Sequence, residues 1–303
     1  MKTTFPNDGI LAALWTPLDA RGRVLKSALA IHLAFLRARG VRGVLTLGST
    51  GEFPRLTLDQ RKAMIEAAAG LAAPMPVIAN ISSPRLGEVA ALGRFARGLD
   101  VAGVALMPPY FYPISQADLL EFFLRAADAV DLPFCLYNFP EYTSNRIGLE
   151  VVAAFADRAR MAAIKQSGDE FGYHVPLVRL GREKGFAVFT GADTRMREAF
   201  ALGAAGCIGG LANFVPEPMV NVFNACLGPD PRPCARDAAR LREIGRAVSG
   251  LAFPLNMAAG MEARGLEPGE PKTAVSADTA KRHRKIVAEL RRKFRAWGLS
   301  PAP

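Results

Sequence analysis

The sequence is poor in the features that mark secreted, membrane-spanning or disulfide-rich proteins. It has four cysteines in 303 residues, and no two of them form a CxxC pair. No uninterrupted apolar segment reaches the roughly 18 residues that a membrane-spanning helix needs. Near the N-terminus, Asn7 and Asp8 precede only a short apolar stretch, which argues against a secretory signal. We therefore expect a cytoplasmic protein without membrane contact, whose cysteines stay reduced and serve the core.

Metal-binding and nucleotide-binding patterns are also missing. The three histidines, His32, His174 and His283, are scattered and form no HxxxH or HxH ligand pair. No GxGxxG follows an apolar run, and no GxxxxGK[ST] phosphate loop occurs. We therefore expect neither a metal nor a cofactor.

Positive charge is concentrated at one end of the chain. The formal net charge is +10, and the segment from Lys281 onward has eight lysines or arginines against one acid, Glu289, so it supplies seven of these ten charges. Four apolar residues in this segment recur at helical spacing, namely Ile286, Leu290, Phe294 and Trp297. This stripe predicts a docked terminal helix with a solvated basic face rather than a nucleic-acid-binding arm. A basic exterior can still steer anionic substrates toward the protein.

Short apolar runs that end in Gly, Pro or a small polar residue (Ser, Thr, Asn or Asp) recur eight times along the chain. They cover residues 10–17, 43–50, 76–82, 103–109, 133–140, 161–168, 186–193 and 206–213. Segments with helical periodicity lie between these runs, as an all-parallel sheet requires. Eight such units predict a closed (β/α)₈ TIM barrel rather than an open doubly wound sheet. We assign residues 1–215 to a catalytic barrel and residues 216–303, where prolines and helical stretches follow, to a C-terminal helical extension.

Reactive side chains follow several of the predicted strands. Lys165 ends the sixth run and Tyr137 lies near the end of the fifth, while Ser49 and Thr50 end the second and Asp193 ends the seventh. In a (β/α)₈ barrel these strand ends meet at one mouth, where active sites lie. A buried lysine amine there is the kind that condenses with carbonyl compounds.

Each of these positions also has a structural interpretation. Lys165 could mark a strand end and reach into water, and Tyr137 could be a half-buried strand tyrosine. The turn at residues 48–52 could cap the next helix, and Asp193 is by itself more typical of a helix N-cap than of a catalytic acid. Their convergence on one mouth favours the catalytic interpretation.

Three motifs together resemble a known family. Gly48–Glu52 (GSTGE) is similar to the G[ST]TGE turn of the class I, Schiff-base pyruvate lyases, the family of dihydrodipicolinate synthase, N-acetylneuraminate lyase and 2-keto-3-deoxy sugar acid aldolases. Residues 137–140 (YNFP) resemble the YNxP of the family, and Ile164–Lys165 resembles the strand that carries its lysine. The order and spacing agree along most of the chain, including residues 206–209 and 265–269.

The resemblance implies a mechanism and a set of site residues. Lys165 would form an imine with a 2-keto acid, Tyr137 would shuttle protons, and Thr50 would complete the catalytic set. The turn of Ser49 and Thr50 would hold the substrate carboxylate, and the carbonyl of Ile208 would help to position the nucleophile. Further substrate contacts are expected from Tyr142, Ser167, Gly191, Asp193, Gly210 and Phe111.

Departures from the family patterns narrow the substrate. Tyr142 stands where the synthases have an arginine for a second carboxylate, and Glu141 beside it would repel a dicarboxylate. Phe111 falls where the family has a tyrosine that reaches the neighbouring subunit's site, although Tyr110 or Tyr112 could take that place. Gly210 lies where the sialic acid lyases have a serine.

We therefore expect a metal-independent class I aldolase or dehydratase acting on a 2-keto-3-deoxy sugar acid or a similar 2-keto acid, with pyruvate as product or co-substrate. Two alternatives stay open: a dihydrodipicolinate synthase that condenses pyruvate with aspartate semialdehyde, and a non-catalytic paralogue that binds a 2-keto acid. The resemblance also implies a homotetramer built as a dimer of dimers.

Overall fold

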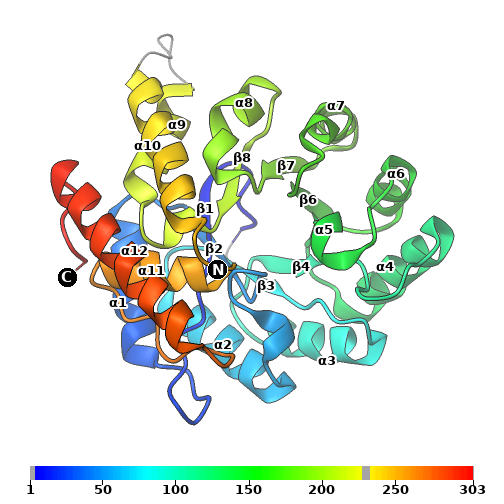
Figure 1. Cartoon of the computed structure of the whole chain (residues 1–303). Coiled ribbons are helices and arrows are strands. Elements are labelled where there is room, and N and C mark those ends of the chain that lie inside the picture. Colours follow the sequence, from blue (N-terminus) through cyan, green and yellow to red (C-terminus); the bar gives the residue numbers. More distant parts are fainter. Residues whose placement is uncertain (1–3, 227–232, 303) are drawn as a thin grey trace.

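Eight parallel strands close into a barrel in the computed structural model, which describes residues 4–226 and 233–302 (Figure 1). The strands are β1 (Gly9–Ala13), β2 (Gly43–Thr46), β3 (Val77–Asn80), β4 (Gly103–Leu106), β5 (Phe134–Asn138), β6 (Met161–Gln166), β7 (Ala187–Thr190) and β8 (Gly206–Gly209). Each strand pairs with the next in the chain, and β8 closes the barrel on β1 with Ile208 opposite Leu11. The predicted (β/α)₈ fold is confirmed.

Helices surround the barrel and cover its outer face (Figure 1). They are α1 (Lys26–Ala38), α2 (Leu58–Leu71), α3 (Leu86–Arg97), α4 (Gln116–Val130), α5 (Pro140–Thr143), α6 (Leu149–Arg158), α7 (His174–Lys184), α8 (Met196–Ala201), α9 (Pro216–Cys226), α10 (Pro233–Val248), α11 (Leu255–Ala263) and α12 (Ala277–Ala296). Local sequence explains several starts: Thr57 and Gln60 form a capping box before α2, and Ser115 caps α4.

Helix α9 occupies the position of the eighth barrel helix. It follows β8, and at its start Glu217 pairs with Arg39 just after α1, with 2.7 Å between Nε and Oε1. Gly40, which follows Arg39, packs against Val220 of α9. The prediction placed residues from 216 onward in the extension, whereas the structure uses α9 to close the helical layer and leaves α10 to α12 beyond it.

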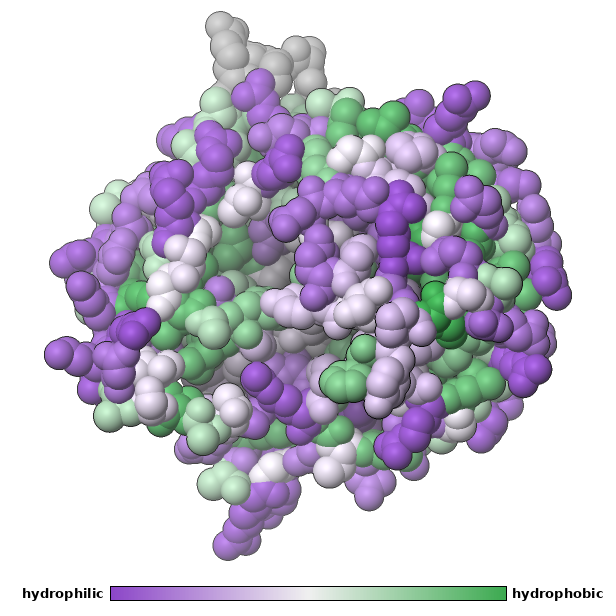
Figure 2. Space-filling model, turned by 45° about the vertical axis from the view of Figure 1, so that its right-hand side comes forward, coloured by the Kyte–Doolittle hydropathy of each residue, from purple (hydrophilic) through white to green (hydrophobic). Residues whose placement is uncertain are grey.

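The basic C-terminal segment docks as predicted. In α12, Ile286, Val287, Leu290 and Phe294 are buried, while the lysines and arginines face outward. Hydrophilic side chains cover most of the face seen in Figure 2, and hydrophobic ones reach the surface in smaller patches. Among the described residues, no helix is long and apolar enough to cross a membrane.

The inside of the barrel is filled by a layer of apolar side chains. Its members are Phe5, Leu11, Ala13, Leu45, Ile78, Ala105, Cys135, Ala163, Phe189 and Ile208. Cys135 and Cys207, which lie in the predicted strands, are both buried, and desolvation raises the pKa of Cys135 to about 12. These thiols are therefore protonated core residues, and reactive groups find room above this layer at the mouth.

Candidate active site

Lys165 and Tyr137 lie side by side at the mouth of the barrel. They are direct partners in the register of β6 and β5. The Lys165 side chain extends along the Tyr137 ring, with Nζ 4.2 Å from the ring centroid and 3.2 Å from the hydroxyl oxygen. Both residues are buried, Lys165 being 4% exposed. An amine held here is shielded from bulk water and has one acid–base group within reach.

Ser49 extends this pair into a chain of three groups. Its Oγ lies 2.8 Å from the Tyr137 hydroxyl oxygen. Ser49, Tyr137 and Lys165 thus form a continuous path along which a proton can move. The sequence-based prediction placed Thr50 in the catalytic set and both Ser49 and Thr50 among the substrate-binding residues. In the structure, the hydroxyl that contacts Tyr137 is that of Ser49.

The turn after β2, which carries Ser49 and Thr50, has a strained backbone. Leu47 and Glu52 both have φ of 60°, a left-handed conformation that costs a non-glycine residue roughly 1–2 kcal/mol. The Asn80 side chain donates a 2.6 Å hydrogen bond to the Leu47 carbonyl and so helps to hold the turn. A Cβ on Gly51 would lie 3.0 Å from the Leu14 carbonyl oxygen, so glycine allows the turn to approach β1 closely.

A buried ion pair joins this turn to the C-terminal extension. Lys272 donates a 3.0 Å hydrogen bond from Nζ to Glu52 Oε1, and both side chains are at most 5% exposed. Arg55 pairs with the other Glu52 oxygen, and the Trp15 ring lies 4.3 Å from the Lys272 ammonium. Burial lowers the pKa of Lys272, and the Glu52 carboxylate opposes this shift. Sequence reasoning missed Lys272, which no local pattern distinguishes.

We expect Lys272→Met to weaken both the fold and substrate binding, because it leaves Glu52 buried with Arg55 as its remaining cation. The free energy of unfolding should fall by about 3 kcal/mol, and KM for the 2-keto acid should rise as the turn loosens. Urea unfolding and steady-state kinetics measure the two effects. Lys184→Met is the control, since Lys184 forms a more exposed pair with Asp157 that is worth about 1 kcal/mol or less. Equal urea unfolding midpoints for Lys272→Met and Lys184→Met would contradict the role of Lys272 in holding the turn.

Asp193 adds a buried carboxylate to the same mouth, one strand beyond the strand of Lys165. Its Oδ2 accepts a 2.8 Å hydrogen bond from the Leu211 N–H, and its Oδ1 accepts from the Cys207 thiol. Burial raises the pKa of Asp193, and this effect outweighs the hydrogen bond from the Leu211 N–H and the charge of Lys165, which both lower it. The interpretation of Asp193 as a helix N-cap is wrong, because Ala192 precedes the first turn and the carboxylate bonds a different segment.

Glycines keep space open beside Lys165. A Cβ on Gly191 would collide with the Ser167 hydroxyl and lie 3.0 Å from Lys165 Cε. A Cβ on Gly210 would lie 3.2 Å from Thr50 Oγ1, at the far side of the same space. Gly191 therefore leaves room that a larger residue would fill, and Gly210 widens the same space.

The resulting inner cavity has a volume of about 200 Å³. It is lined by Ser49, Thr50, Tyr137, Phe139, Tyr142, Lys165, Ser167, Gly168, Gly191, Asp193, Ile208, Gly210, Phe253 and Met257. The structure thus brings together the predicted site residues other than Phe111. Phe253 and Met257 were missed, because they come from the extension, where no motif pointed to the site.

Phe111 lies outside the cavity of its own chain. It is 78% exposed, has φ of 86°, and makes an edge-to-face contact with Tyr112 at 4.8 Å between ring centroids. Its neighbour Tyr110 is half-buried against Phe53. A role for Phe111 in an adjacent subunit's site stays a prediction.

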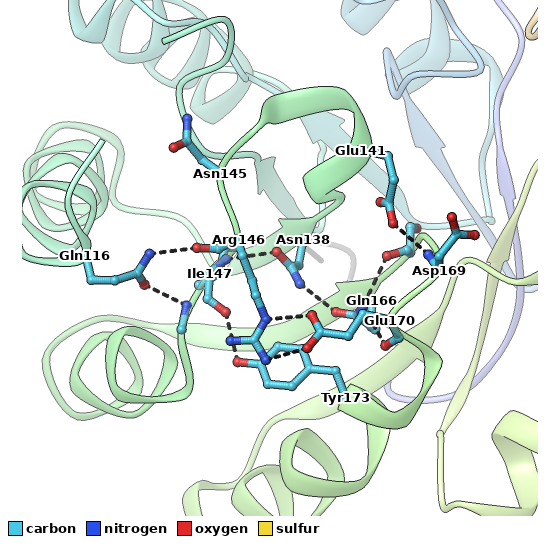
Figure 3. A network of polar contacts seen from close by, with 12 residues as sticks. Gln116, Asn138, Glu141, Asn145, Arg146, Ile147, Gln166, Asp169, Glu170 and Tyr173 are labelled. Atoms are coloured by element: carbon cyan, nitrogen blue, oxygen red, sulfur yellow. Dashed lines mark hydrogen bonds and ion pairs between the residues drawn. The ribbon is translucent and has the colours of Figure 1, made fainter. Parts of the chain in front are cut away.

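Polar contacts tie the loop after β5 to the loop after β6, as Figure 3 shows. The Asn138 amide donates a 2.7 Å hydrogen bond to Gln166 Oε1, and its oxygen accepts from the Ile147 N–H. Arg146 forms a two-point ion pair with Glu170. Tyr142 therefore sits on a loop whose base is fixed to the strand of Lys165.

Glu141 is engaged within the same pair of loops. Its carboxylate accepts a 2.7 Å hydrogen bond from the Asp169 N–H, and it fills the space that a Cβ on Gly168 would need (Figure 3). Its negative charge is thereby held next to Tyr142. The predicted repulsion of a second substrate carboxylate fits this placement.

Comparison with known proteins agrees with the site and with the fold. The model of the dihydrodipicolinate synthetase family matches residues 6–290. The chain belongs to this family. The 4-hydroxy-tetrahydrodipicolinate synthase of Methanosarcina barkeri is 28% identical over 94% of this chain and 98% of its own length.

Solved structures of this family superpose closely. A prophage protein of the dihydrodipicolinic acid synthase family from E. coli K12, solved in complex with pyruvate, has a TM-score of 0.87 and 27% identity over 94% of this chain and 98% of its own. The 2-keto-3-deoxygluconate aldolase of Picrophilus torridus shares the fold, with a TM-score of 0.83 and 24% identity over 90% and 99% of the two chains. Membership of the dihydrodipicolinate synthetase family confirms the prediction of a pyruvate-dependent Schiff-base lyase.

Proposed function

We propose that Lys165 of this lyase forms an imine with a 2-keto-3-deoxy sugar acid or a similar 2-keto acid, and that pyruvate is released or added. The observation that carries the proposal is the buried Lys165 amine, 3.2 Å from the Tyr137 hydroxyl at the base of a cavity. The relative from E. coli K12 solved with pyruvate supports the same substrate class.

The residues around the cavity have different roles in this reaction. The hydroxyls and backbone of the Ser49–Thr50 turn hold the substrate carboxylate, so that the adjacent ketone carbon faces Lys165 Nζ. Tyr137 gives a proton to the departing carbinolamine oxygen and receives it back through Ser49. The iminium then withdraws electrons from the C3–C4 bond of an aldol or from the C3–H bond in a dehydration. Asp193 lines the same cavity, where it can accept a proton from a C4 hydroxyl.

Borohydride trapping tests this proposal directly. Incubation with pyruvate and borohydride should leave a reduced pyruvoyl adduct on the peptide that contains Lys165, detected by mass spectrometry. Lys272 is the internal control, because its ammonium is paired with Glu52 and lies outside the inner cavity. No adduct, or an adduct on another lysine, would reject the Schiff-base assignment.

Dihydrodipicolinate synthase activity is the second candidate, which the named function of the Methanosarcina barkeri relative favours. Tyr142, in the place of an arginine, and the fixed charge of Glu141 count against it, because a phenol cannot replace a guanidinium that binds a carboxylate at two points. The third possibility is a paralogue that binds a 2-keto acid without turnover. Binding alone does not require the hydrogen-bonded chain of Ser49, Tyr137 and Lys165, which counts against this possibility.

We also propose a cytoplasmic homotetramer, built from dimers whose loops after β4 meet. Phe111 and Tyr112 support this arrangement, since two adjacent rings more than 70% exposed are unusual on a surface that stays in water. Sedimentation velocity of the purified protein tests the assembly.

A further inference from the structure

A second, larger cavity adjoins the inner one. It has a volume of about 310 Å³ and shares Ser49, Tyr142 and Phe253 with the cavity above Lys165. Its other lining residues are Glu52, Phe53, Pro54, Arg55, Met107, Tyr110, Thr143 and Pro254. A substrate bound through Lys165 therefore has this outer cavity as the place for the part of the molecule beyond its C4 atom.

Aromatic rings form a continuous wall from the inner cavity to the outer one. Phe139 lies 6.1 Å from the Tyr137 ring and meets Tyr142 edge to face at 4.4 Å between centroids. Tyr142 in turn stacks on Phe253 at 5.8 Å, with 25° between the ring planes. Tyr142 remains 53% exposed although its ring is packed on both neighbours, so a face of this aromatic wall is open to a ligand.

Two polar side chains of the outer cavity, Glu52 and Thr143, are already engaged. Glu52 is paired with Arg55 and with the buried Lys272. The Thr143 hydroxyl donates to backbone carbonyl oxygens, including that of Asn145 at 2.9 Å. The Arg55 guanidinium and the hydroxyls of Tyr110 and Tyr142 are the polar groups left for a ligand, and the other lining side chains are mostly apolar. A sugar chain placed here would exchange several hydrogen bonds to water for these few, which is unfavourable.

The inner cavity has the opposite character. The hydroxyls of Ser49, Thr50 and Ser167 and the carboxylate of Asp193 line it around Lys165. This set suits a 2-keto acid head with one further hydroxyl, the group that an aldol cleavage needs at C4. The combined site is therefore polar at the reacting end and aromatic at the outer end.

We infer that the substrate is a 4-hydroxy-2-keto acid with an aromatic group on C4, and that the products of its cleavage are pyruvate and an aromatic aldehyde. This inference rests on the proposed function, since Lys165 must hold the 2-keto acid end, and among the 2-keto acids proposed there it selects an aromatic one in place of a sugar acid. The Tyr142–Phe253 pair and the Phe53–Tyr110 pair, which makes an edge-to-face contact at 5.9 Å, both line the outer cavity and offer aromatic faces on which a planar ring can pack.

The cleavage balances without an oxidant or other co-reactant. Lys165 joins C2 as an iminium with loss of one water. The C4 hydroxyl gives its proton to a base in the cavity, and the electron pair of the C3–C4 bond moves to the iminium, leaving an enamine and the aldehyde. The enamine takes a proton at C3, and one water hydrolyses the imine to pyruvate and the free amine.

The acceptor preference of the wild-type enzyme tests the inference in the synthetic direction. With pyruvate held constant, kcat/KM is measured for benzaldehyde, glyceraldehyde and aspartate semialdehyde. Burial of a ring should favour benzaldehyde by about 10- to 100-fold over either polar aldehyde. An equal or higher value for glyceraldehyde or aspartate semialdehyde would overturn the inference.

Tyr142→Ser provides a second measurement, and its exposed position makes the change compatible with folding. We expect kcat/KM for benzaldehyde to fall about 10-fold, with a smaller change for glyceraldehyde. Ile31→Ala, at an exposed apolar position on α1 outside both cavities, should change neither value. An unaltered preference in Tyr142→Ser would contradict the aromatic wall.

Borohydride trapping distinguishes failure of the proposed function from failure of the inference about the aromatic substrate. Absence of a pyruvoyl adduct on Lys165 overturns the proposed function and the inference with it. An adduct on Lys165 together with no preference for benzaldehyde overturns the inference alone.

Discussion

Lys165→Ala is expected to abolish turnover, lowering kcat by at least about 10⁴-fold, while the protein keeps its fold. The variant removes the amine that forms the imine, and no other described lysine lines the inner cavity. The fold should survive because a buried ammonium contributes little to stability once its desolvation is counted, and Lys165 is 4% exposed. Pyruvate release measures activity, and circular dichroism with thermal unfolding measures the fold.

Lys165→Arg separates imine chemistry from charge. A guanidinium keeps the positive charge near Tyr137 but stays protonated and does not condense with a ketone. We expect it to be as inactive as the alanine variant. Lys184→Ala, outside the cavity, is the control for loss of a lysine. Substantial activity in either Lys165 variant would mean that another group carries the reaction.

The main part of this site was predictable because its groups belong to local patterns. Lys165 and Tyr137 each end an apolar run, and the hydroxyls of Ser49 and Thr50 end another. Parallel strands around a barrel bring such ends together whatever the loops between them do. The strand register then makes Tyr137 and Lys165 direct partners, a relation that follows from topology rather than from nearness in the sequence.

The parts that escaped prediction depend on contacts between distant segments. Lys272 meets Glu52 across 220 positions of sequence, and Phe253 and Met257 reach the cavity from the helical extension. Nothing in the local pattern of these residues distinguishes them from surface or core positions. The partner of Asp193 is likewise a backbone N–H, that of Leu211, which every residue type other than proline offers.

The roles of Ser49 and Thr50 show a different limit of prediction from the sequence. The two hydroxyls are adjacent in sequence and both line the inner cavity, where Thr50 Oγ1 lies beside Gly210. In the structure the Ser49 hydroxyl is the one that lies 2.8 Å from the Tyr137 hydroxyl. A residue pattern without backbone angles cannot make this choice, and the resemblance placed Thr50 in the catalytic set.

The chain of hydroxyls leads to the second large effect, which is expected for Tyr137→Phe. Removal of the hydroxyl should lower kcat by about 10²- to 10⁴-fold, the usual contribution of a positioned acid–base group. The ring and its packing against Phe139 are kept, so the free energy of unfolding should change by roughly 1–2 kcal/mol, chiefly because Ser49 Oγ loses its 2.8 Å partner. Stopped-flow or single-turnover trapping measures the rate of imine formation.

Ser49→Ala is the matched comparison, because it interrupts the same chain one step further from Lys165. If Tyr137 is the group that exchanges protons with the carbinolamine, its loss must slow imine formation more than the loss of Ser49, which acts through Tyr137. Both variants should still yield the pyruvoyl adduct after long incubation, because Lys165 remains. A Tyr137→Phe enzyme that forms the adduct at the wild-type rate would show that water, rather than the phenol, carries the proton.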